Sequence, residues 1–309
     1  MERAGDGGER ADPTISVVIA SNREPARIVR CLEGLVAQTL DGGVEAVVVD
    51  DGAPVALDEA VEAFAPRLRV RALRGPGRGP AAARNAGVAA ARGRFVAFTD
   101  DDCVAEPDWL RLLVAALVER PDAIAGGTVR NLLEADRYAQ TTQRLFDFLY
   151  ASYGHGTTRR FFGSGNMALG REAFLAAGGF DESFPLPGGE DRELCERWQE
   201  EGRELVLVPD AVVVHAHPLT LATFVRQHRN YGRGAYQLRR RRPAGAAGAT
   251  VGPEPVRFYL RLLADPFGRE PFPRAVTQSA LLAVTQVATA VGYLDGRRRA
   301  RSARPHRGA

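Results

Sequence analysis

The chain has 309 residues, of which 45% are hydrophobic and 26% are charged, a composition typical of a globular protein rather than a disordered or fibrous one. Its formal net charge is only +3, so the overall charge gives no reason to expect a nucleic-acid partner. All 41 basic residues are arginine. Without lysine the chain can hold neither a Schiff-base lysine nor a Walker-type phosphate loop, which excludes pyridoxal enzymes anchored on their own lysine and Walker nucleotide triphosphatases.

The cysteines and the N-terminal segment bear on the cellular compartment. Cys31, Cys103 and Cys195 are odd in number and far apart, which argues against a disulfide framework and against structural zinc. Residues 1–13 are polar and lack the apolar stretch of a secretory signal, so we expect a disordered tail there. These features predict a cytoplasmic protein.

The first hundred residues alternate between buried strands and helices. Apolar runs predict strands at 15–20, 44–49, 68–73 and 94–99, and the segments between them predict helices at 25–40, 57–65 and 80–91. This alternation is typical of an α/β fold with a mostly parallel nucleotide-binding sheet flanked by helices. Ligands of such sheets bind beyond the carboxyl ends of the strands, where Asp50-Asp51 and Asp100 to Asp102 lie.

The rest of the chain is less regular. We expect a helix at 107–119, a short strand near 123–129, a helix after Gly188-Gly189, and strand material at 204–217 that ends in two histidines. Beyond residue 218 the chain becomes Arg-rich and then hydrophobic. The predicted organisation is a catalytic domain at 14–218, with halves 14–103 and 104–218, followed by a helical extension and basic tail at 219–309.

Three consecutive carboxylates end the fourth predicted strand. Asp100, Asp101 and Asp102 repel one another unless a cation or a proton intervenes. A hard divalent ion such as Mg²⁺ or Mn²⁺ would neutralise them. A polar turn that caps the following helix is the alternative, since Asp-rich turns are common.

Five stretches of the chain resemble family 2 glycosyltransferases of the GT-A fold. They are SVVIASNREPARIVRCLEGLVAQTL, VEAVVVDDGA, GPAAARNAGVAAARGRFVAFTDDDCVAEPDWL, GSGNMALGREAFLAAGGFDE and GGEDRELCERW. Each is weakly specific alone, but five in the right order on the right elements, from residue 15 to about residue 218, form a specific signal. The resemblance implies a metal-dependent, inverting transfer of a sugar from a nucleoside diphosphate sugar, of the UDP or TDP type, to an acceptor hydroxyl.

The resemblance also implies a set of donor-binding residues. They are Ala20, Ser21, Asp51, Arg84, Asp100, Asp101, Gly163, Ser164 and Asn166. Asp51 matches the carboxylate that binds the base, Arg84 a residue near the base and phosphates, and Asp100 the carboxylate on the ribose side. Gly163, Ser164 and Asn166 match a loop beneath the sugar, although a Gly-rich turn would have the same composition.

The metal and the proton acceptor come from other parts of the chain. By the same resemblance Asp102 is the metal-binding end of the DxD motif, with Asp101 as a substitute because three consecutive aspartates leave the register open. His215 completes the metal site for Mn²⁺ or Mg²⁺, with His217 as the alternative. Asp191 matches the general base and Glu190 competes for that role, although acidic residues at a helix N-terminus also offset the helix dipole.

The C-terminal extension combines arginine clusters with an apolar stretch. Residues 226–242 and 297–307 contain arginines and no acid, and residues 275–294 are long enough to span a bilayer. Polar residues interrupt that stretch along one helical stripe, which favours an amphipathic helix over a lipid-surrounded one. The stripe consists of Gln278, Thr285, Thr289 and Gly292. Peripheral contact with the inner face of the membrane and a helix packed on the domain both stay open, and nucleic-acid binding is disfavoured.

Two further functions fit parts of the pattern. One is a non-catalytic protein that binds nucleotide sugars, and the other is a sugar nucleotidyltransferase, whose sheet and carboxylates are similar. The nucleotidyltransferase usually has a Gly-rich first loop, and the first loop here is SNREP. A dehydrogenase is disfavoured because Pro80 replaces the third glycine of the GPGRGP loop, which follows the third strand rather than the first. The sequence leaves the sugar open, and the acceptor could be a glycan, a lipid-linked compound or a small molecule.

Overall fold

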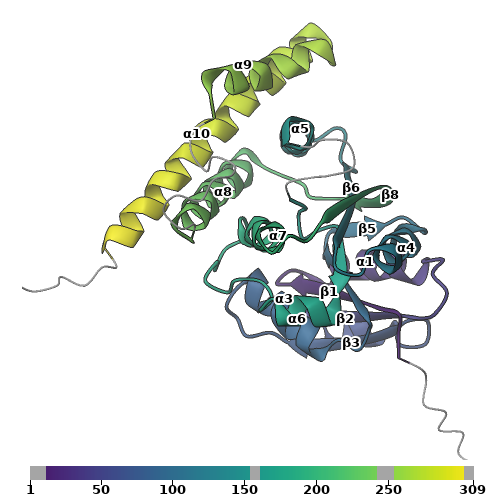
Figure 1. Ribbon diagram of the computed structural model, residues 1–309. Coiled ribbons are helices and arrows are strands. Elements are labelled where there is room, and N and C mark those ends of the chain that lie inside the picture. The colour runs from purple at the N-terminus through teal and green to yellow at the C-terminus, as the bar shows by residue number, and fades with distance from the viewer. Residues whose placement is uncertain (1–11, 154–160, 242–253, 303–309) are drawn as a thin grey trace, which may run out of the picture.

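The computed structural model describes residues 12–153, 161–241 and 254–302 (Figure 1). Most of the expected N-terminal tail and the last seven residues of the basic tail lie outside this part of the chain. An eight-stranded sheet forms the body of the molecule, with strand order β3-β2-β1-β4-β7-β6-β8-β5. Helices cover both faces of the sheet, as the sequence predicts for an α/β protein.

The N-terminal half of the sheet is wholly parallel. Its strands are β1 (Ile15–Ser21), β2 (Val44–Asp50), β3 (Arg69–Arg74) and β4 (Phe95–Asp100), and its helices are α1 (Pro25–Val36), α2 (Asp58–Glu62) and α3 (Pro80–Ala90). Continuous apolar runs form β1, β2 and β4 because helices cover both faces of these strands. All of these elements were predicted, with ends that differ by up to four residues.

The C-terminal half of the sheet is mixed. Its strands are β5 (Cys103–Ala105), β6 (Ile124–Asn131), β7 (Met167–Gly170) and β8 (Leu205–His215), with helices α4 (Trp109–Glu119), α5 (Arg137–Tyr153), α6 (Arg171–Ala176) and α7 (Glu190–Glu200). Strand β7 runs antiparallel between β4 and β6, whereas β6 and β8 are parallel. The sequence gives no clear signal for β5 or β7 because strands of three and four residues show no periodicity.

Two hydrophobic cores lie on opposite faces of the sheet. Alternate residues of β1 point to opposite sides, so Val17 belongs to the core beneath α1, α2 and α4, and Val18 to the core beneath α3, α6 and α7. Both tryptophans are fully buried, Trp109 in the first core and Trp198 in the second. The carboxyl ends of β1, β2 and β4 are thereby held at one rigid edge.

The C-terminal helices form a separate layer beside the sheet (Figure 1). They are α8 (Leu221–Arg241), α9 (Val256–Ala264), the 3₁₀ turn η1 (Asp265–Gly268) and α10 (Phe272–Ser302). Helices α8 and α10 approach so closely that a Cβ atom on Gly232 would overlap the carbonyl oxygen of Thr289, and one on Gly292 would overlap that of Arg229. Helix α10 is the outermost element of this layer.

Candidate active site

The aspartate that ends the triplet lies among three basic groups. The Oδ1 atom of Asp102 is 3.0 Å from Nε2 of His215, and its Oδ2 atom is 2.8 Å from Nδ1 of His217. Arg27, in the first turn of α1, approaches Oδ2 to 2.7 Å. The last residue of β8 and the loop after it thus meet the end of β4, and the two imidazole rings stack in nearly parallel planes.

The electrostatics of this cluster favour the ionised carboxylate. Burial disfavours its charge, but the hydrogen bonds and charges of both histidines hold the pKa of Asp102 well below its ordinary value. Burial also opposes the charge of His215, yet Asp102 raises its pKa. Asp102 is therefore a buried, ionised carboxylate that is surrounded by basic side chains.

The other two aspartates of the triplet point elsewhere. The Asp101 carboxylate accepts a hydrogen bond from the hydroxyl of Ser21, and burial raises its pKa. Asp100 is half-exposed and accepts a hydrogen bond from Arg84 at 2.9 Å. Gly165 lies so close that a Cβ atom there would be 2.9 Å from Oδ2 of Asp100. The three carboxylates thus have different hydrogen-bond partners, although Arg27 also lies 3.9 Å from Asp101 and the charges of Asp102 and Asp100 contribute to the raised pKa of Asp101.

A buried arginine joins the end of β4 to the start of α7. Arg84 of α3 donates to Asp100 at 2.9 Å and to Glu190 at 3.3 Å. Burial opposes its charge, but the two carboxylates raise its pKa. The prediction placed Arg84 near the base and phosphates; the guanidinium instead spans the two acidic clusters, and that predicted role stays untested.

The two candidate bases begin α7 and differ in their contacts. Glu190 is buried, pairs with Arg84 and accepts the backbone N–H of Gly188 at 2.8 Å. Burial and the charge of Asp191 raise the pKa of Glu190 to about 7. Burial likewise raises the pKa of Asp191, which accepts the backbone N–H of Arg192 at 2.8 Å. A raised pKa brings a carboxylate closer to the range in which a general base works.

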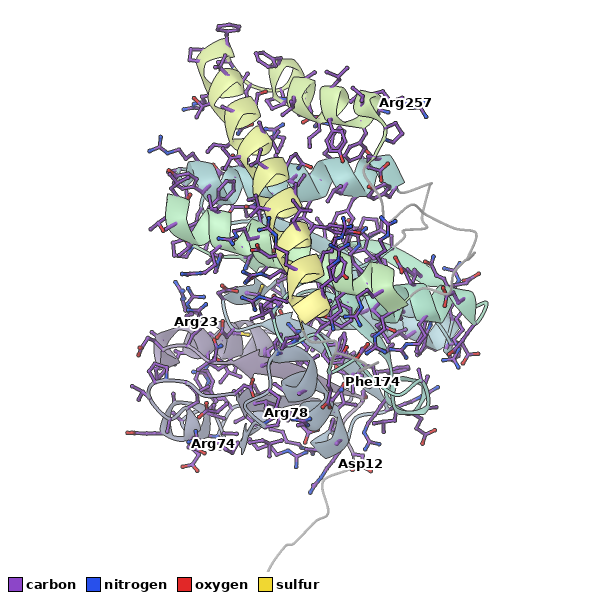
Figure 2. All side chains as sticks on the ribbon, turned by 90° about the vertical axis from the view of Figure 1, so that its left-hand side faces the viewer. Asp12, Arg23, Arg74, Arg78, Phe174 and Arg257 are labelled. Carbon is purple, nitrogen blue, oxygen red and sulfur yellow. The ribbon has the colours of Figure 1, made fainter. Side chains whose placement is uncertain are left out.

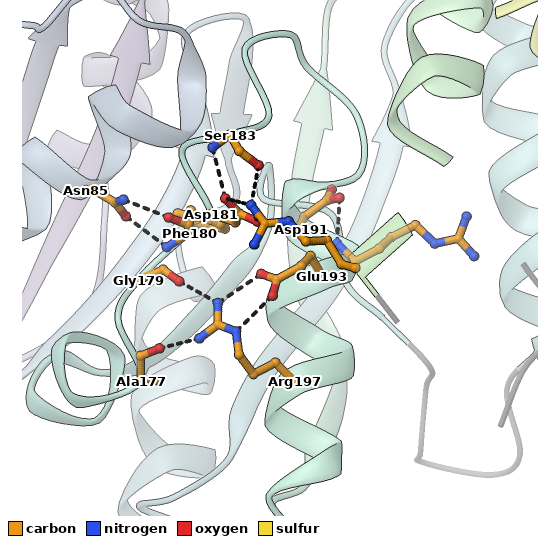
Figure 3. Close-up of polar contacts among 11 residues, drawn as sticks. Asn85, Ala177, Gly179, Phe180, Asp181, Ser183, Asp191, Glu193 and Arg197 are labelled. Carbon is orange, nitrogen blue, oxygen red and sulfur yellow. Dashed lines mark hydrogen bonds and ion pairs between the residues drawn. The ribbon is translucent and has the colours of Figure 1, made fainter. Parts of the chain in front are cut away.

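The loop before α7 is fastened from two sides (Figure 3). Asn85 of α3 donates to the carbonyl oxygen of Phe180 and accepts that residue's N–H, both at 2.9 Å. Arg197 of α7 donates to the carbonyl oxygens of Ala177 and Gly179. These contacts fix the position of the helix that presents Asp191.

Helix α8 of the C-terminal layer packs against the glycine turn that precedes α7. Gly188 and Gly189 both have positive φ angles, 118° and 112°, which favour glycine. A Cβ atom on Gly188 would be 2.8 Å from the ring of Tyr231, and one on Gly234 would overlap the carbonyl oxygen of Gly188. Burial, and then the charges of the nearby carboxylates, raise the pKa of Tyr231, so its hydroxyl stays neutral.

The remaining predicted donor residues lie at or near the same edge of the sheet. The Asp51 carboxylate accepts the backbone N–H groups of Gly77 and Gly79, at 2.7 and 3.1 Å, and so fastens the Gly-rich loop. Ala20 and Ser21 end β1 beside it, and the N–H of Asp51 donates to the carbonyl oxygen of Ser21. A carboxylate has about four lone-pair sites, so Asp51 can still accept a further hydrogen bond from a base.

In the predicted sugar loop of Gly163, Ser164 and Asn166, some side chains are used for packing and hydrogen bonds within the protein. The side chain of Asn166 is buried, accepts the indole N–H of Trp109 at 2.8 Å and donates to the carbonyl oxygens of Thr128 and Ala211. The amide is thus turned into the sheet and shapes the loop from inside. Ser164 is also buried, whereas a Cβ atom on Gly163 would lie 3.8 Å from Oδ2 of Asp191.

Sequence reasoning missed Arg27 and Tyr231. Nothing distinguishes Arg27 among 41 arginines, since its importance comes from the packing of α1 against the end of β4. Tyr231 belongs to the Arg-rich segment, which the sequence assigns to an extension outside the catalytic part. An aromatic residue within a basic helix was the one available signal.

The cluster around Asp102 can be tested for its fit to a divalent metal. Asp102, His215 and His217 each offer one ligand atom, and these atoms lie within 4.8 Å of one another. A carboxylate with two imidazoles is a ligand set that transition metals accept. Cys103 also lies near Asp100 and Asp102, and burial, followed by the charges of these carboxylates, raises the pKa of its thiol well above the ordinary value.

The comparisons with known proteins define the class. Residues 16–178 match the model of glycosyl transferase family 2, and residues 144–217 match that of the N-terminal domain of galactosyltransferase. The first match covers more than half of the chain, so the chain belongs to glycosyltransferase family 2. The resemblance inferred from the five stretches is confirmed, and this member of the family has a DxD-type acidic cluster.

Individual relatives agree with this class. The chain is 30% identical over 250 residues to the pre-mycofactocin glycosyltransferase of Mycobacterium tuberculosis, a match that covers 78% of this chain and 50% of that protein. The chain therefore spans about half the length of this curated relative. It also resembles the mannosyltransferase PcManGT from Pyrobaculum calidifontis, solved with GDP-Man and Mn²⁺, with a TM-score of 0.65, 19% identity and coverage of 92% of this chain and 87% of that chain. GalNAc-T7, solved with UDP, GalNAc and Mn²⁺, gives a TM-score of 0.56 with 17% identity, covering 95% of this chain and 57% of that one. These solved structures confirm the GT-A fold.

Proposed function

We propose that this glycosyltransferase is metal-dependent and inverting, and that it moves a sugar from a nucleoside diphosphate sugar to an acceptor hydroxyl. The observation that supports this most directly is the bridge through Arg84, which contacts Asp100 at 2.9 Å and Glu190 at 3.3 Å. Asp100 lies close to Asp102, the proposed metal ligand, and Glu190 directly precedes Asp191, the candidate base. One buried guanidinium thus joins the two acidic clusters of the site.

Asp102, His215 and His217 would hold the metal. When bound, a divalent ion would offset the negative charge on the departing nucleoside diphosphate. The two imidazoles favour Mn²⁺ over Mg²⁺, because Mg²⁺ binds almost wholly through oxygen ligands. The solved structures bound to Mn²⁺ also support a divalent metal, and we retain Mn²⁺ or Mg²⁺ as the proposed cofactor.

The proposed donor site is the edge formed by the ends of β1, β2 and β4. Asp51 would bind the base, and Asp100 and Asp101 would face the ribose and diphosphate side. Ala20, Ser21 and the loop of Gly163, Ser164 and Asn166 would shape the pocket, Asn166 through the backbone it supports. A base N–H that donates to Asp51 favours uracil or thymine. The structurally similar mannosyltransferase PcManGT, however, was solved with GDP-Man, a guanine nucleotide.

Asp191 is the proposed general base. Its carboxylate would take the proton of the acceptor hydroxyl while that oxygen forms a bond to the anomeric carbon. The bond from that carbon to the diphosphate oxygen breaks in the same displacement, which inverts the configuration. Glu190 is committed to Arg84 and to the N–H of Gly188, so it would position the site rather than accept the proton.

The acceptor and the cellular location are also part of the proposal. The acceptor would be a glycan, a lipid-linked compound or a small molecule, and nucleic acid would not be a partner. We propose a cytoplasmic enzyme in contact with the inner face of the membrane through its C-terminal helices. Residues 14–218 would form the catalytic unit, with 219–309 as its helical extension.

Thermal unfolding with UDP, TDP and GDP, each with and without Mn²⁺, tests the donor site. A ligand at a hundred times its dissociation constant adds about 2.7 kcal/mol to the stability of the folded state. We expect a shift with one of these nucleotides that needs Mn²⁺ and disappears in Asp102→Asn. Release of the nucleoside diphosphate from the matching sugar nucleotide then tests transfer, and binding without any release would favour a non-catalytic nucleotide-sugar-binding protein.

A further inference from the structure

Helix α10 buries its polar stripe. Thr285 is fully buried, Gln278 and Gly292 are buried, and Thr289 directs its hydroxyl toward the carbonyl oxygen of His228 in α8. The sequence left open whether this helix packs on the domain or contacts a membrane, and the stripe is the side that packs. Its small and polar residues let α8 and α10 approach closely.

The opposite face of α10 is apolar and exposed. Its members recur at steps of four, seven, four and three residues, which places them on one side of the helix: Val276, Ala280, Val287, Val291 and Leu294. Val287 is 65% exposed, and Phe272 at the start of the helix is 73% exposed. The sequence has no acidic or basic residue from 275 to 294, a length of about 30 Å at 1.5 Å per residue.

Only one helix of the described residues, Phe272–Arg301, is long and apolar enough to cross a membrane, and a third of its most apolar 18-residue stretch is buried. Figure 2 shows α10 running across the front of the molecule, turned away from the sheet. An exposed apolar face of this length is uncommon in a protein that stays in water.

The charges around this face have one sign. Between residues 254 and 301 the exposed charged residues are Arg257, Arg261, Arg269, Arg274, Arg297, Arg298, Arg299 and Arg301. The acidic residues of the same segment are half-buried and paired within the chain: Glu254 with Tyr153, Asp265 with Arg144 and Arg269, Glu270 with Arg144, and Asp295 with Arg229 and Arg233. The apolar face is therefore flanked by positive charge at both ends.

We infer that the outer face of α10 docks on the surface of an anionic lipid bilayer, with the helix lying parallel to the membrane plane. Apolar side chains would enter the boundary between headgroups and acyl chains, and the arginines at the two ends would contact anionic headgroups. A spanning orientation is disfavoured, because it would carry into the lipid the ion pairs of Asp295 with Arg229 and Arg233 on α8.

Docking in this plane would bring the membrane close to the candidate active site. Helix α8 contacts α10 on one side and the Gly188-Gly189 turn before Asp191 on the other. Packed helices are about 8–10 Å apart, and the two helices α10 and α8 separate the docked face from that turn. An acceptor anchored in the bilayer would suit this arrangement. The acceptor rests on the proposed glycosyl transfer, whereas the docking itself does not.

Sedimentation with sucrose-loaded vesicles tests the docking, using a 3:1 mixture of phosphatidylcholine and phosphatidylglycerol and, in parallel, phosphatidylcholine alone. We expect the full chain to sediment with the anionic vesicles, less so at high salt, and weakly with the neutral ones. The double variant Val287→Glu/Val291→Glu should bind at least about tenfold more weakly, because it places two charges in the apolar face. Val118→Glu is the matched control, since Val118 on α4 is 56% exposed but lies outside this face.

The arginines are tested in the same assay. Arg274→Gln/Arg297→Gln should weaken binding to the anionic vesicles several-fold and leave neutral vesicles unaffected. Arg92→Gln/Arg94→Gln is the matched control, because these exposed arginines lie between α3 and β4. Unchanged thermal unfolding of each variant, with and without UDP and Mn²⁺, shows that the fold and the nucleotide site survive.

Three outcomes would overturn the docking. One is equal binding to neutral and anionic vesicles, and another is an equal loss in Val118→Glu and in the α10 double variant. The third is a dimer in solution that the α10 double variant converts to a monomer, since a second copy of the chain would then cover this face. Vesicle binding requires no sugar transfer, so a failure of the proposed enzymatic function would leave this result unaffected.

Discussion

The sheet and the C-terminal helix pair differ in where their polar and apolar side chains lie, although both bury apolar residues, Leu282 among them in the helix pair. In the sheet, apolar residues such as Val17 and Val18 are fully buried, and the charged residues gather at the carboxyl ends of the strands. In the helix pair, Thr285 is fully buried while Val287 is 65% exposed. The charged residues of the sheet form the candidate active site, whereas the exposed apolar face of α10 is the surface proposed to dock on a membrane.

The two regions also treat charge differently. At the end of β4 the carboxylates have basic neighbours, as the buried Asp102 has His215 and the half-exposed Asp100 has Arg84. Between residues 254 and 301 the acidic residues are half-buried and paired, whereas the arginines are exposed. This difference means that substitutions at the sheet edge should affect catalysis and nucleotide binding, while substitutions on the outer face of α10 should affect neither.

The largest expected effect is that of Asp102→Asn. Loss of the charge leaves His215, His217 and Arg27 around a neutral amide, so the metal site loses its one anion. We expect transfer to fall below detection and the Mn²⁺-dependent thermal shift with nucleotide to vanish. Asp210→Asn, an exposed position in β8, is the control and should behave as the wild type.

Asp191→Asn should abolish transfer while nucleotide binding stays intact. General-base catalysis contributes about 10²–10⁴-fold, so kcat should fall by at least about a hundredfold. Glu190→Gln should cost less, because Glu190 does not take the proton and the amide oxygen still replaces one of the two carboxylate oxygens that accept from Arg84 and Gly188. A larger loss of kcat in Glu190→Gln than in Asp191→Asn would reverse the two assigned roles.

The pH dependence of kcat/KM sharpens the same assignment. A general base works deprotonated, so activity is full above its pKa and falls as the pH drops through it. Because burial raises the pKa of Asp191, the acid limb should lie above the ordinary aspartate value of about 3.9. Glu190→Gln removes a neighbouring negative charge and should move the limb to lower pH. An acid limb that does not move would mean that Glu190 does not influence the base.

Gly234→Ala should have an intermediate effect that links the two regions. The added Cβ atom would overlap the carbonyl oxygen of Gly188 and push α8 away from the turn before Asp191. We expect a loss of about 1–3 kcal/mol in the free energy of unfolding, as for overpacked cores, together with a lower kcat. The matched control is Gly268→Ala in η1, where an added Cβ atom meets nothing within 4 Å. Full activity in Gly234→Ala would show that α8 does not set the geometry of the site.

The smallest expected effect is that of Val287→Glu on the isolated protein. A surface substitution that breaks no contact usually changes stability by no more than about 0.5 kcal/mol. Chemical denaturation and transfer to a soluble acceptor should therefore match the wild type. A clear loss of stability would mean that this face packs against the chain itself and is not available to a membrane.

The sequence determined the class of fold and the position of the acidic clusters. A buried parallel strand must be apolar along its whole length, so β1, β2 and β4 are visible as continuous runs, and the aspartates that follow β2 and β4 must lie at the same edge. The ordered stretches that resemble family 2 enzymes added the class of reaction. These features are local or follow from strand order, which is why one sequence suffices.

Tertiary structure decided how the site is connected and which way α10 faces. The contacts of Asp102 with both histidines and with Arg27 join residues far apart in the chain, so no spacing could have selected them. The bridge through Arg84 depends likewise on α3 lying between β4 and α7. For α10, helical periodicity separates a polar stripe from an apolar one, but only the packing of α8 determines which of the two is buried.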